Sequence, residues 1–116
     1  DYDGRPIHYA QELGLHVDPS TLTPPKIAWT PSPGASSLVF YRGDAFPKWR
    51  DQAIIATLAK NDLYRYVLDE NGEVEHEALI GGLGRFRDVE VGPKGELVIL
   101  LEHRAGSQIL RLVPAD

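Results

Sequence analysis

Seven short β-rich runs dominate this chain and constrain its fold class. The runs are rich in Val, Ile, Leu and Tyr, and turn signals such as Asn71-Gly72 separate them. Asn-Gly between two hydrophobic runs is typical of a tight β-hairpin. The sequence therefore predicts an all-β meander of consecutive strands. The predicted strands are residues 36–41, 52–58, 62–69, 73–80, 87–92, 96–101 and 108–113.

The second group of strands repeats the first. When the two groups are superposed, Leu38 matches Val89 and Leu63 matches Ile109, at offsets of 51 and 46 residues. A repeat of this length with four strands per unit is typical of the blades of a β-propeller. We therefore expect a β-propeller, of which this chain holds about two blades.

Three regions follow from this repeat. Residues 1–35 are rich in proline and are expected to form a loop or linker that leads into a four-stranded blade, residues 36–80. Residues 81–116 are expected to form a final blade of three strands, whose last strand leaves a bare apolar edge of the kind that native proteins cover. Because two blades cannot close a ring, we expect a C-terminal fragment of a propeller, with the fourth strand of the last blade supplied from elsewhere.

Composition and charge exclude several classes of function. The net charge of -5 and the scattered basic residues argue against a nucleic-acid surface, which needs a basic face or stripe. The chain has no cysteine, which excludes disulfides, thiolate metal sites and a cysteine nucleophile. No apolar run approaches the roughly 20 residues that a membrane-spanning helix needs. We therefore expect neither a nucleic-acid partner nor a membrane span.

Arg85 and Arg87 stand out at the start of a predicted strand. Residues two apart in a strand point to the same face, so the two arginines project together while Phe86 points into the packing between blades. A guanidinium is always charged and can hold a carboxylate with two parallel hydrogen bonds, which suits a carboxylate-bearing ligand at the mouth of a propeller channel. The alternative is a surface ion pair between Arg85 and a nearby acid such as Asp88 or Glu90. The residues alone leave both interpretations open.

The other polar and aromatic candidates have less specific interpretations. Asp88 is expected to orient Arg87 or to cap a turn. Trp29 lies between proline-rich segments, where it either stacks on a sugar ring or packs in the interior, whereas Trp49 in "FPKW" is expected at a packed corner of the blade. The four histidines are too widely separated along the chain to predict a metal site. They are His8, His16, His76 and His103.

Two segments carry a family resemblance over nearly the whole chain. "FYRGDAFPKWR" and "GRFRDVEVGPKGEL" are similar to the C-terminal part of the soluble quinoprotein glucose/sorbosone dehydrogenases. These enzymes are six-bladed propellers that oxidise aldose sugars with pyrroloquinoline quinone (PQQ). In that family a basic pair, matched here by Arg85 and Arg87, contacts the carboxylates of the quinone, and a tryptophan matched by Trp29 lies at the rim of the active site. A lysine that some members use against the cofactor falls on Ala59, so either the adjacent Lys60 takes its place or the contact is absent.

The resemblance implies a PQQ-dependent aldose sugar dehydrogenase in which this chain contacts the cofactor carboxylates without supplying a catalytic residue. The general-base histidine, its carboxylate partner and the ligands of a calcium ion belong to earlier blades of the family fold and are expected outside this chain, which alone is expected to be inactive. The implied partners are a sugar substrate and the remaining blades, and the implied location is periplasmic or secreted. The motif "WTPSPGAS" departs from the family pattern at Pro33, Gly34 and Ala35. A non-catalytic propeller that binds a protein or a glycan is the alternative, because one fold hosts many functions.

Overall fold

The computed structural model describes residues 18–71 and 74–116, which fall into two units, 1–32 and 33–116. The described part of the first unit is loop around a short 3-10 turn, η1 (Pro19–Thr21). Asp18 starts this turn, since its Oδ1 accepts hydrogen bonds from the backbone N–H and the hydroxyl of Ser20 at 2.9 and 2.8 Å. Residues 1–17 of the expected loop, and Gly72 of the expected hairpin turn, lie outside the described residues.

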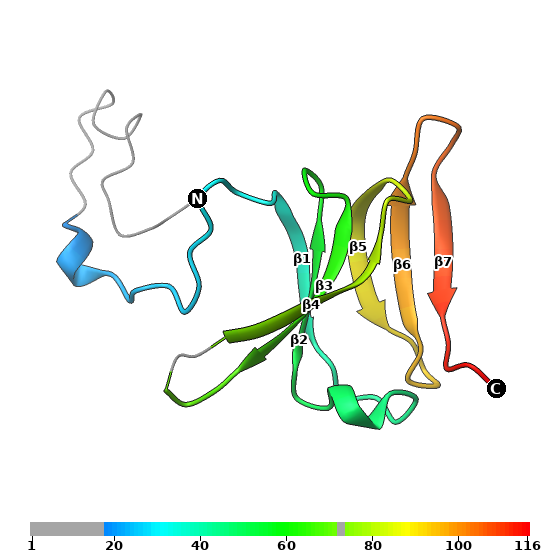
Figure 1. Ribbon diagram of the computed structural model, residues 1–116, viewed down its shortest axis with the longest axis horizontal. Coiled ribbons are helices and arrows are strands. Elements are labelled where there is room, and N and C mark those ends of the chain that lie inside the picture. The colour runs from blue at the N-terminus through cyan, green and yellow to red at the C-terminus, as the bar shows by residue number, and fades with distance from the viewer. Residues whose placement is uncertain (1–17, 72–73) are drawn as a thin grey trace. The chain divides into compact units, whose positions relative to one another are not determined.

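The described residues of the second unit form two antiparallel sheets (Figure 1). Both sheets are meanders, and the predicted all-β class is confirmed. Each predicted strand is present, with its ends shifted by no more than two residues, and the β5 strand begins at Arg85 rather than at Arg87. The first sheet contains β1 (Ala35–Phe40), β2 (Ala53–Thr57), β3 (Asp62–Leu68) and β4 (Val74–Gly81), and the second contains β5 (Arg85–Val91), β6 (Leu97–Glu102) and β7 (Gln108–Leu112).

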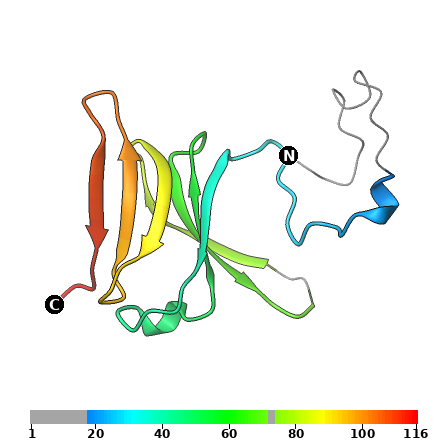
Figure 2. The ribbon, with the colours of Figure 1, turned by 180° about the vertical axis from the view of Figure 1, so that it is seen from behind.

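The hydrophobic core of this unit lies between the two sheets, where β5 packs against β1 and β2 (Figure 2). On β6 every second side chain is buried, as the two-residue period of a strand requires. Each fully buried aliphatic or aromatic side chain stabilises the fold by about 1.5 to 3 kcal/mol. The core residues are Ile54, Ala56 and Leu63 of the first sheet, Phe86, Val89, Leu97, Ile99 and Leu101 of the second, and Tyr41.

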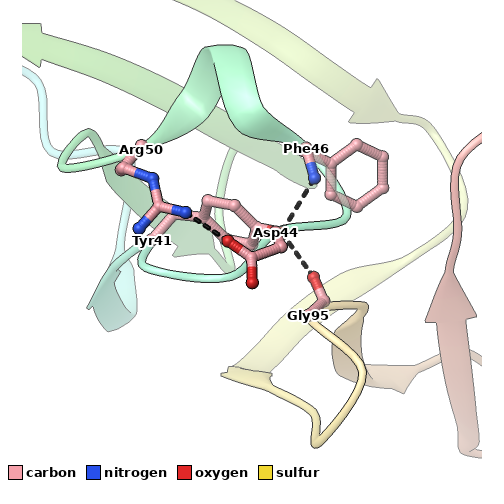
Figure 3. Close-up of polar contacts among 5 residues, drawn as sticks. All are labelled: Tyr41, Asp44, Phe46, Arg50 and Gly95. Carbon is pink, nitrogen blue, oxygen red and sulfur yellow. Dashed lines mark hydrogen bonds and ion pairs between the residues drawn. The ribbon is translucent and has the colours of Figure 1, made fainter.

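Tyr41 ties the connection after β1 to the turn between β5 and β6. Its buried hydroxyl donates a hydrogen bond to the carbonyl oxygen of Gly95 at 2.6 Å and accepts one from the backbone N–H of Phe46 at 3.0 Å (Figure 3). The ring of Phe46, just before the 3-10 turn η2 (Pro47–Trp49), stacks on that of Trp49, the last residue of the turn, with centroids 4.1 Å apart. A Cβ on Gly43 would lie 2.5 Å from the Tyr41 hydroxyl, so only glycine fits there. The packed corner expected at "FPKW" is confirmed.

The second sheet ends in an edge that is open within the part of the chain that the structure describes. β7 pairs with β6 on one side, and Ile109 on β7 is 72% exposed. Leu38 and Phe40 of β1 are also about half exposed, on the face of the first sheet that points away from the core. These side chains are apolar surface that another element can cover. Among the described residues, no helix has the length and apolar character needed to cross a membrane.

Candidate anion-binding site at the start of strand β5

Arg85 and Arg87 are both exposed at the start of β5, while Phe86 between them is fully buried. The side chains of the two arginines are 49% and 42% exposed. The prediction that Phe86 points to the face of the strand opposite the two arginines is therefore confirmed, and Phe86 packs into the core between the sheets. Both guanidiniums reach solvent, and the opposite face of the strand is packed in the core.

A β-bulge interrupts the strand at Arg87. Phe86 pairs with Leu101 and Asp88 pairs with Leu100, so Arg87 has no partner of its own on β6. Because of this extra residue, Arg87 and Asp88 are both exposed, and Val89 returns to the core. Bulges often re-aim side chains next to functional sites. Here the bulge sets the direction of the second arginine.

Glu102, the last residue of β6, pairs with both arginines. It lies directly opposite Arg85 in the sheet, and its Oε1 lies 3.6 Å from Nη1 of Arg85, which makes an ion pair beyond hydrogen-bond distance. Its Oε2 accepts a hydrogen bond from Nε of Arg87. This bond and the charges of the two guanidiniums lower the pKa of the Glu102 carboxyl.

The acids that the sequence offered as partners of the arginines were the wrong ones. Asp88 does not orient Arg87, because its Oδ1 accepts a hydrogen bond from the backbone N–H of Val89 at 2.9 Å and it forms no ion pair with either arginine. Glu90 pairs with neither arginine as well. The carboxylate that holds them comes from the neighbouring strand, because the sheet register places Glu102 opposite Arg85.

Ser36 holds the backbone beside the bulge. Its hydroxyl lies 2.6 Å from the carbonyl oxygen of Phe86 and 3.1 Å from that of Ala56. A hydroxyl has one proton, so the shorter contact, to Phe86, is the stronger hydrogen bond. Ser36 itself sits in an irregular step of β1, between Ala35 and Ser37. This contact joins β1 to the peptide that directly precedes Arg87.

A surface depression of about 460 Å³ opens beside Arg85. Glu102 at the end of β6 lines it, as do the next two residues, His103 and Arg104, in the connection between β6 and β7. Gly84 lines it as well, and a Cβ there would lie 2.5 Å from the carbonyl oxygen of Glu102. Arg104 is exposed and forms no ion pair with any residue that the structure describes. The full lining is Asn61, Gly82, Gly84, Arg85, Glu102, His103 and Arg104.

Lys60 lies in the turn between β2 and β3. Hydrogen bonds connect this turn to the loop before Arg85. The backbone N–H of Gly82 donates to the carbonyl oxygen of Asn61 at 3.1 Å. In the amide orientation that satisfies its neighbours, the Asn61 side chain also donates to the carbonyl oxygen of Gly84 at 3.3 Å. Lys60 is exposed, and its ammonium forms no ion pair with the described residues. The turn that carries Lys60 thus borders the same depression as Arg85.

Trp29 is half-buried and belongs to the first unit, residues 1–32. The arginines, Lys60 and Glu102 belong to the second unit. Within the second unit, Glu102 pairs with both Arg85 and Arg87, and the turn of Lys60 is hydrogen-bonded to the loop before Arg85. Trp29 is not part of this unit. Its role at a substrate entrance stays a prediction.

The arrangement is suited to hold an anion rather than to transfer a proton. Arg85 and Arg104 line the depression with a single carboxylate, Glu102, and Arg87 is bonded to that carboxylate, so positive charge is in excess. Planar guanidiniums bind carboxylates through paired hydrogen bonds. Within residues 18–71 and 74–116, no three histidine, aspartate or glutamate side chains come together as a metal site would need.

Comparison with known proteins gives a consistent result. The family described as Glucose / Sorbosone dehydrogenase matches residues 1–111. The aldose sugar dehydrogenase YliI of Escherichia coli is 33% identical over 95 residues, which cover 79% of this chain and 25% of that protein. An uncharacterized protein of Synechocystis sp. is 35% identical over 100 residues, which cover 83% of this chain and 24% of that protein.

Solved structures are similar as well. A chain described as glucose dehydrogenase superposes with a TM-score of 0.71 at 36% sequence identity, over 83% of this chain and 30% of that one. This chain spans about a quarter of the length of the two curated relatives, YliI and the Synechocystis protein.

Proposed function

Because the chain belongs to the glucose/sorbosone dehydrogenase family, we propose that it is part of a PQQ-dependent aldose sugar dehydrogenase and holds the cofactor through its carboxylates. The observation that carries this proposal is the pair Arg85 and Arg87, both exposed and both paired with Glu102, which lines a basic depression together with Arg85. The sugar dehydrogenases among the relatives support the reaction class.

The two sheets are, in this proposal, neighbouring blades of a six-bladed propeller. Two features support it: the sheets are consecutive meanders of four and three strands, and the first strand of the second sheet packs against the first two strands of the first. The exposed edge of β7 and the apolar outer face of the first sheet are surfaces that further strands and blades would cover.

The residues present fit PQQ, which carries three carboxylates. Arg85 and Arg87 would each hold a carboxylate, and Lys60 would supply a further positive charge from the turn that borders the depression. Glu102 neutralises part of this charge and so limits the repulsion between the two guanidiniums. When bound, the quinone supplies the acceptor for the hydride that leaves the sugar.

The work of this chain is binding and orientation. The described residues around the depression include no carboxylate free of a cation, because Glu102 is engaged by both arginines. As the family resemblance implies, we propose that the general base that takes the hydroxyl proton of the sugar lies outside this chain. Trp29 is proposed to contact the sugar at the substrate entrance. No three carboxylate or histidine side chains of the described residues come together, and we propose that the ligands of a calcium ion lie outside this chain as well.

Reconstitution of the full-length protein tests the proposal. The protein freed of bound cofactor is titrated with PQQ, and the binding curve is followed by fluorescence and by sugar-dependent reduction of a dye. We expect saturable PQQ binding and activity with aldoses that depends on PQQ. A folded protein that binds no PQQ, and instead binds a protein or a glycan at this face, would overturn the proposal in favour of a non-catalytic propeller.

A further inference from the structure

Glu102 engages the two arginines unequally. Its Oε2 accepts a hydrogen bond from Nε of Arg87, whereas Nη1 of Arg85 lies 3.6 Å from Oε1, too far for a hydrogen bond. The carboxylate is thus bonded to one guanidinium and only near the other. Glu102 therefore fixes Arg87 and leaves Arg85 free to turn towards the depression that it lines.

The bond to Arg87 occupies Nε of the guanidinium and leaves the two terminal nitrogens open to a ligand. A guanidinium carries five donors, and the two terminal nitrogens form the fork that grips a carboxylate with parallel hydrogen bonds. Glu102 occupies Nε, and neither terminal nitrogen of Arg87 bonds to any residue in the described part of the chain. The plane of the guanidinium is therefore held while its two-pronged edge stays available.

The backbone alone would not hold Arg87 in this orientation. Arg87 is the extra residue of the β-bulge and has no cross-strand partner, and its side chain is 42% exposed. An exposed arginine side chain loses rotamer entropy when it is fixed. A ligand that had to order this side chain would bind more weakly by that cost, and a side chain already held by Glu102 avoids it.

We propose that Glu102 is a positioning residue, which holds Arg87 through its Nε–H so that the terminal fork of Arg87 meets a ligand carboxylate already oriented. This inference rests on the proposed function for the identity of the ligand, PQQ. It assigns different roles to the three residues: Arg85 and Arg87 contact the anion, and Glu102 acts on the anion only through Arg87.

Two substitutions at this position separate the hydrogen bond from the charge. Glu102→Gln removes the charge but keeps an amide oxygen that can accept the Nε–H bond, whereas Glu102→Ala removes both. In the full-length protein we expect Glu102→Ala to weaken PQQ binding about tenfold, the ratio for one hydrogen bond to a charged group, and Glu102→Gln to stay within about threefold of the parent. Gln as weak as Ala would mean that only the charge counts, and would overturn the positioning role.

The chain offers a matched control in Arg65 and Glu77. Nε of Arg65 donates to Oε1 of Glu77 at 2.7 Å across β3 and β4, so this pair has the same bond from Nε to a carboxylate away from the depression, although a terminal nitrogen of Arg65 also donates to Gln52. Glu77→Ala is expected to leave PQQ affinity unchanged. If Glu102→Ala also leaves affinity unchanged, or tightens binding, then Glu102 is only structural or competes with the ligand, and the inference is wrong.

A measurement without PQQ separates this inference from the proposed function. In ligand-free protein labelled with ¹⁵N-arginine, the Nε–H signal of Arg87, identified by its loss in Arg87→Lys, is expected to be protected from exchange with water in the parent and in Glu102→Gln. It should lose this protection in Glu102→Ala. Protection with no PQQ binding in the parent would sink the proposed function and leave Glu102 as the residue that orients Arg87, while an unprotected signal in the parent would overturn the positioning role itself.

Discussion

The hydroxyl of Tyr41 donates a hydrogen bond of 2.6 Å to the carbonyl oxygen of Gly95, and so joins a loop of the first sheet to the turn of the second (Figure 3). The same hydroxyl accepts the backbone N–H of Phe46 at 3.0 Å. Because Tyr41 and Gly95 are both buried, removal of the hydroxyl leaves the carbonyl oxygen of Gly95 without its partner.

Tyr41→Phe is therefore expected to destabilise the full-length protein by about 1 to 3 kcal/mol, the cost of leaving buried polar groups unsatisfied. Urea unfolding measures this loss. Tyr64→Phe is the control, because the Tyr64 hydroxyl donates to Asp62 at 2.8 Å in a partly buried position and its loss should cost less. Equal costs for the two variants would contradict the importance of the Tyr41 contact.

Ser36→Ala is expected to weaken PQQ binding a few-fold as well as to lower stability by about 1 kcal/mol, the usual net value of a hydrogen bond. The Ser36 hydroxyl holds the carbonyl of Phe86, directly before the bulge that aims Arg87. Ser37→Ala is the control, since that hydroxyl bonds to no residue in the described ranges. A loss of stability with unchanged affinity would show that the bulge keeps its shape without Ser36.

The sequence alone was sufficient to predict the strands, because turn residues and apolar runs are local signals. It also predicted that Phe86 points away from the two arginines, which follows from the period of a strand. The bulge at Arg87 was missed, although a signal existed: Phe86 and Val89 are apolar at a spacing of three, whereas an unbroken strand buries residues at a spacing of two.

Glu102 could not be predicted without that bulge. In an unbroken hairpin the register of Val91 with Leu97 and of Val89 with Ile99 continues, and Arg85 then falls opposite His103. The extra residue shifts the pairing by one and brings Glu102 opposite Arg85 instead. Cross-strand partners depend on register, and a single misplaced residue changes every later pair.

Glu96→Gln is expected to destabilise the protein at neutral pH and to have little effect at low pH. Hydrogen bonds from the backbone N–H groups of Glu96 and Lys94, together with Arg111, lower the pKa of the buried Glu96 carboxyl. The folded protein therefore takes up this proton at a lower pH than the unfolded chain does, so the stabilisation is complete above the pKa of the unfolded chain, about 4.3, and fades as the pH falls through the lowered value. Urea unfolding of parent and variant at pH 7 and near pH 3 measures the difference. A difference in the free energy of unfolding between parent and variant that is the same at both pH values would contradict this role of the charge.

The 116-residue chain expressed alone is expected to self-associate, because β7 offers an open apolar edge with Ile109 72% exposed. Ile109→Lys should raise the fraction of monomer, since a charge on an edge strand opposes pairing with another copy. Analytical ultracentrifugation measures this fraction. Leu22→Lys replaces an exposed leucine in the first unit and serves as the control. A compact monomer of the parent chain with one cooperative unfolding transition would refute the prediction.

Arg85→Ala and Arg87→Ala are each expected to weaken PQQ binding by the full-length protein by about 1.5 to 3 kcal/mol, or roughly ten- to a hundredfold, because each removes charge-assisted hydrogen bonds. Lysine at either position should restore only part of this affinity, since an ammonium keeps the charge but lacks the two-pronged geometry. PQQ titration of the cofactor-free protein, followed by fluorescence, gives these affinities.

Phe86→Ala provides the contrast between binding and folding at the same strand. Phe86 is fully buried between the sheets, so its truncation should cost about 3 to 5 kcal/mol of stability through the cavity that it leaves. The fraction that still folds should bind PQQ with nearly the parent affinity, because the guanidiniums lie on the opposite face of the strand. Affinity that stays at the parent value in both alanine variants of the arginines, in protein shown to be folded, would mean that the pair serves only the ion pairs with Glu102 and would remove the main support for cofactor binding by this chain.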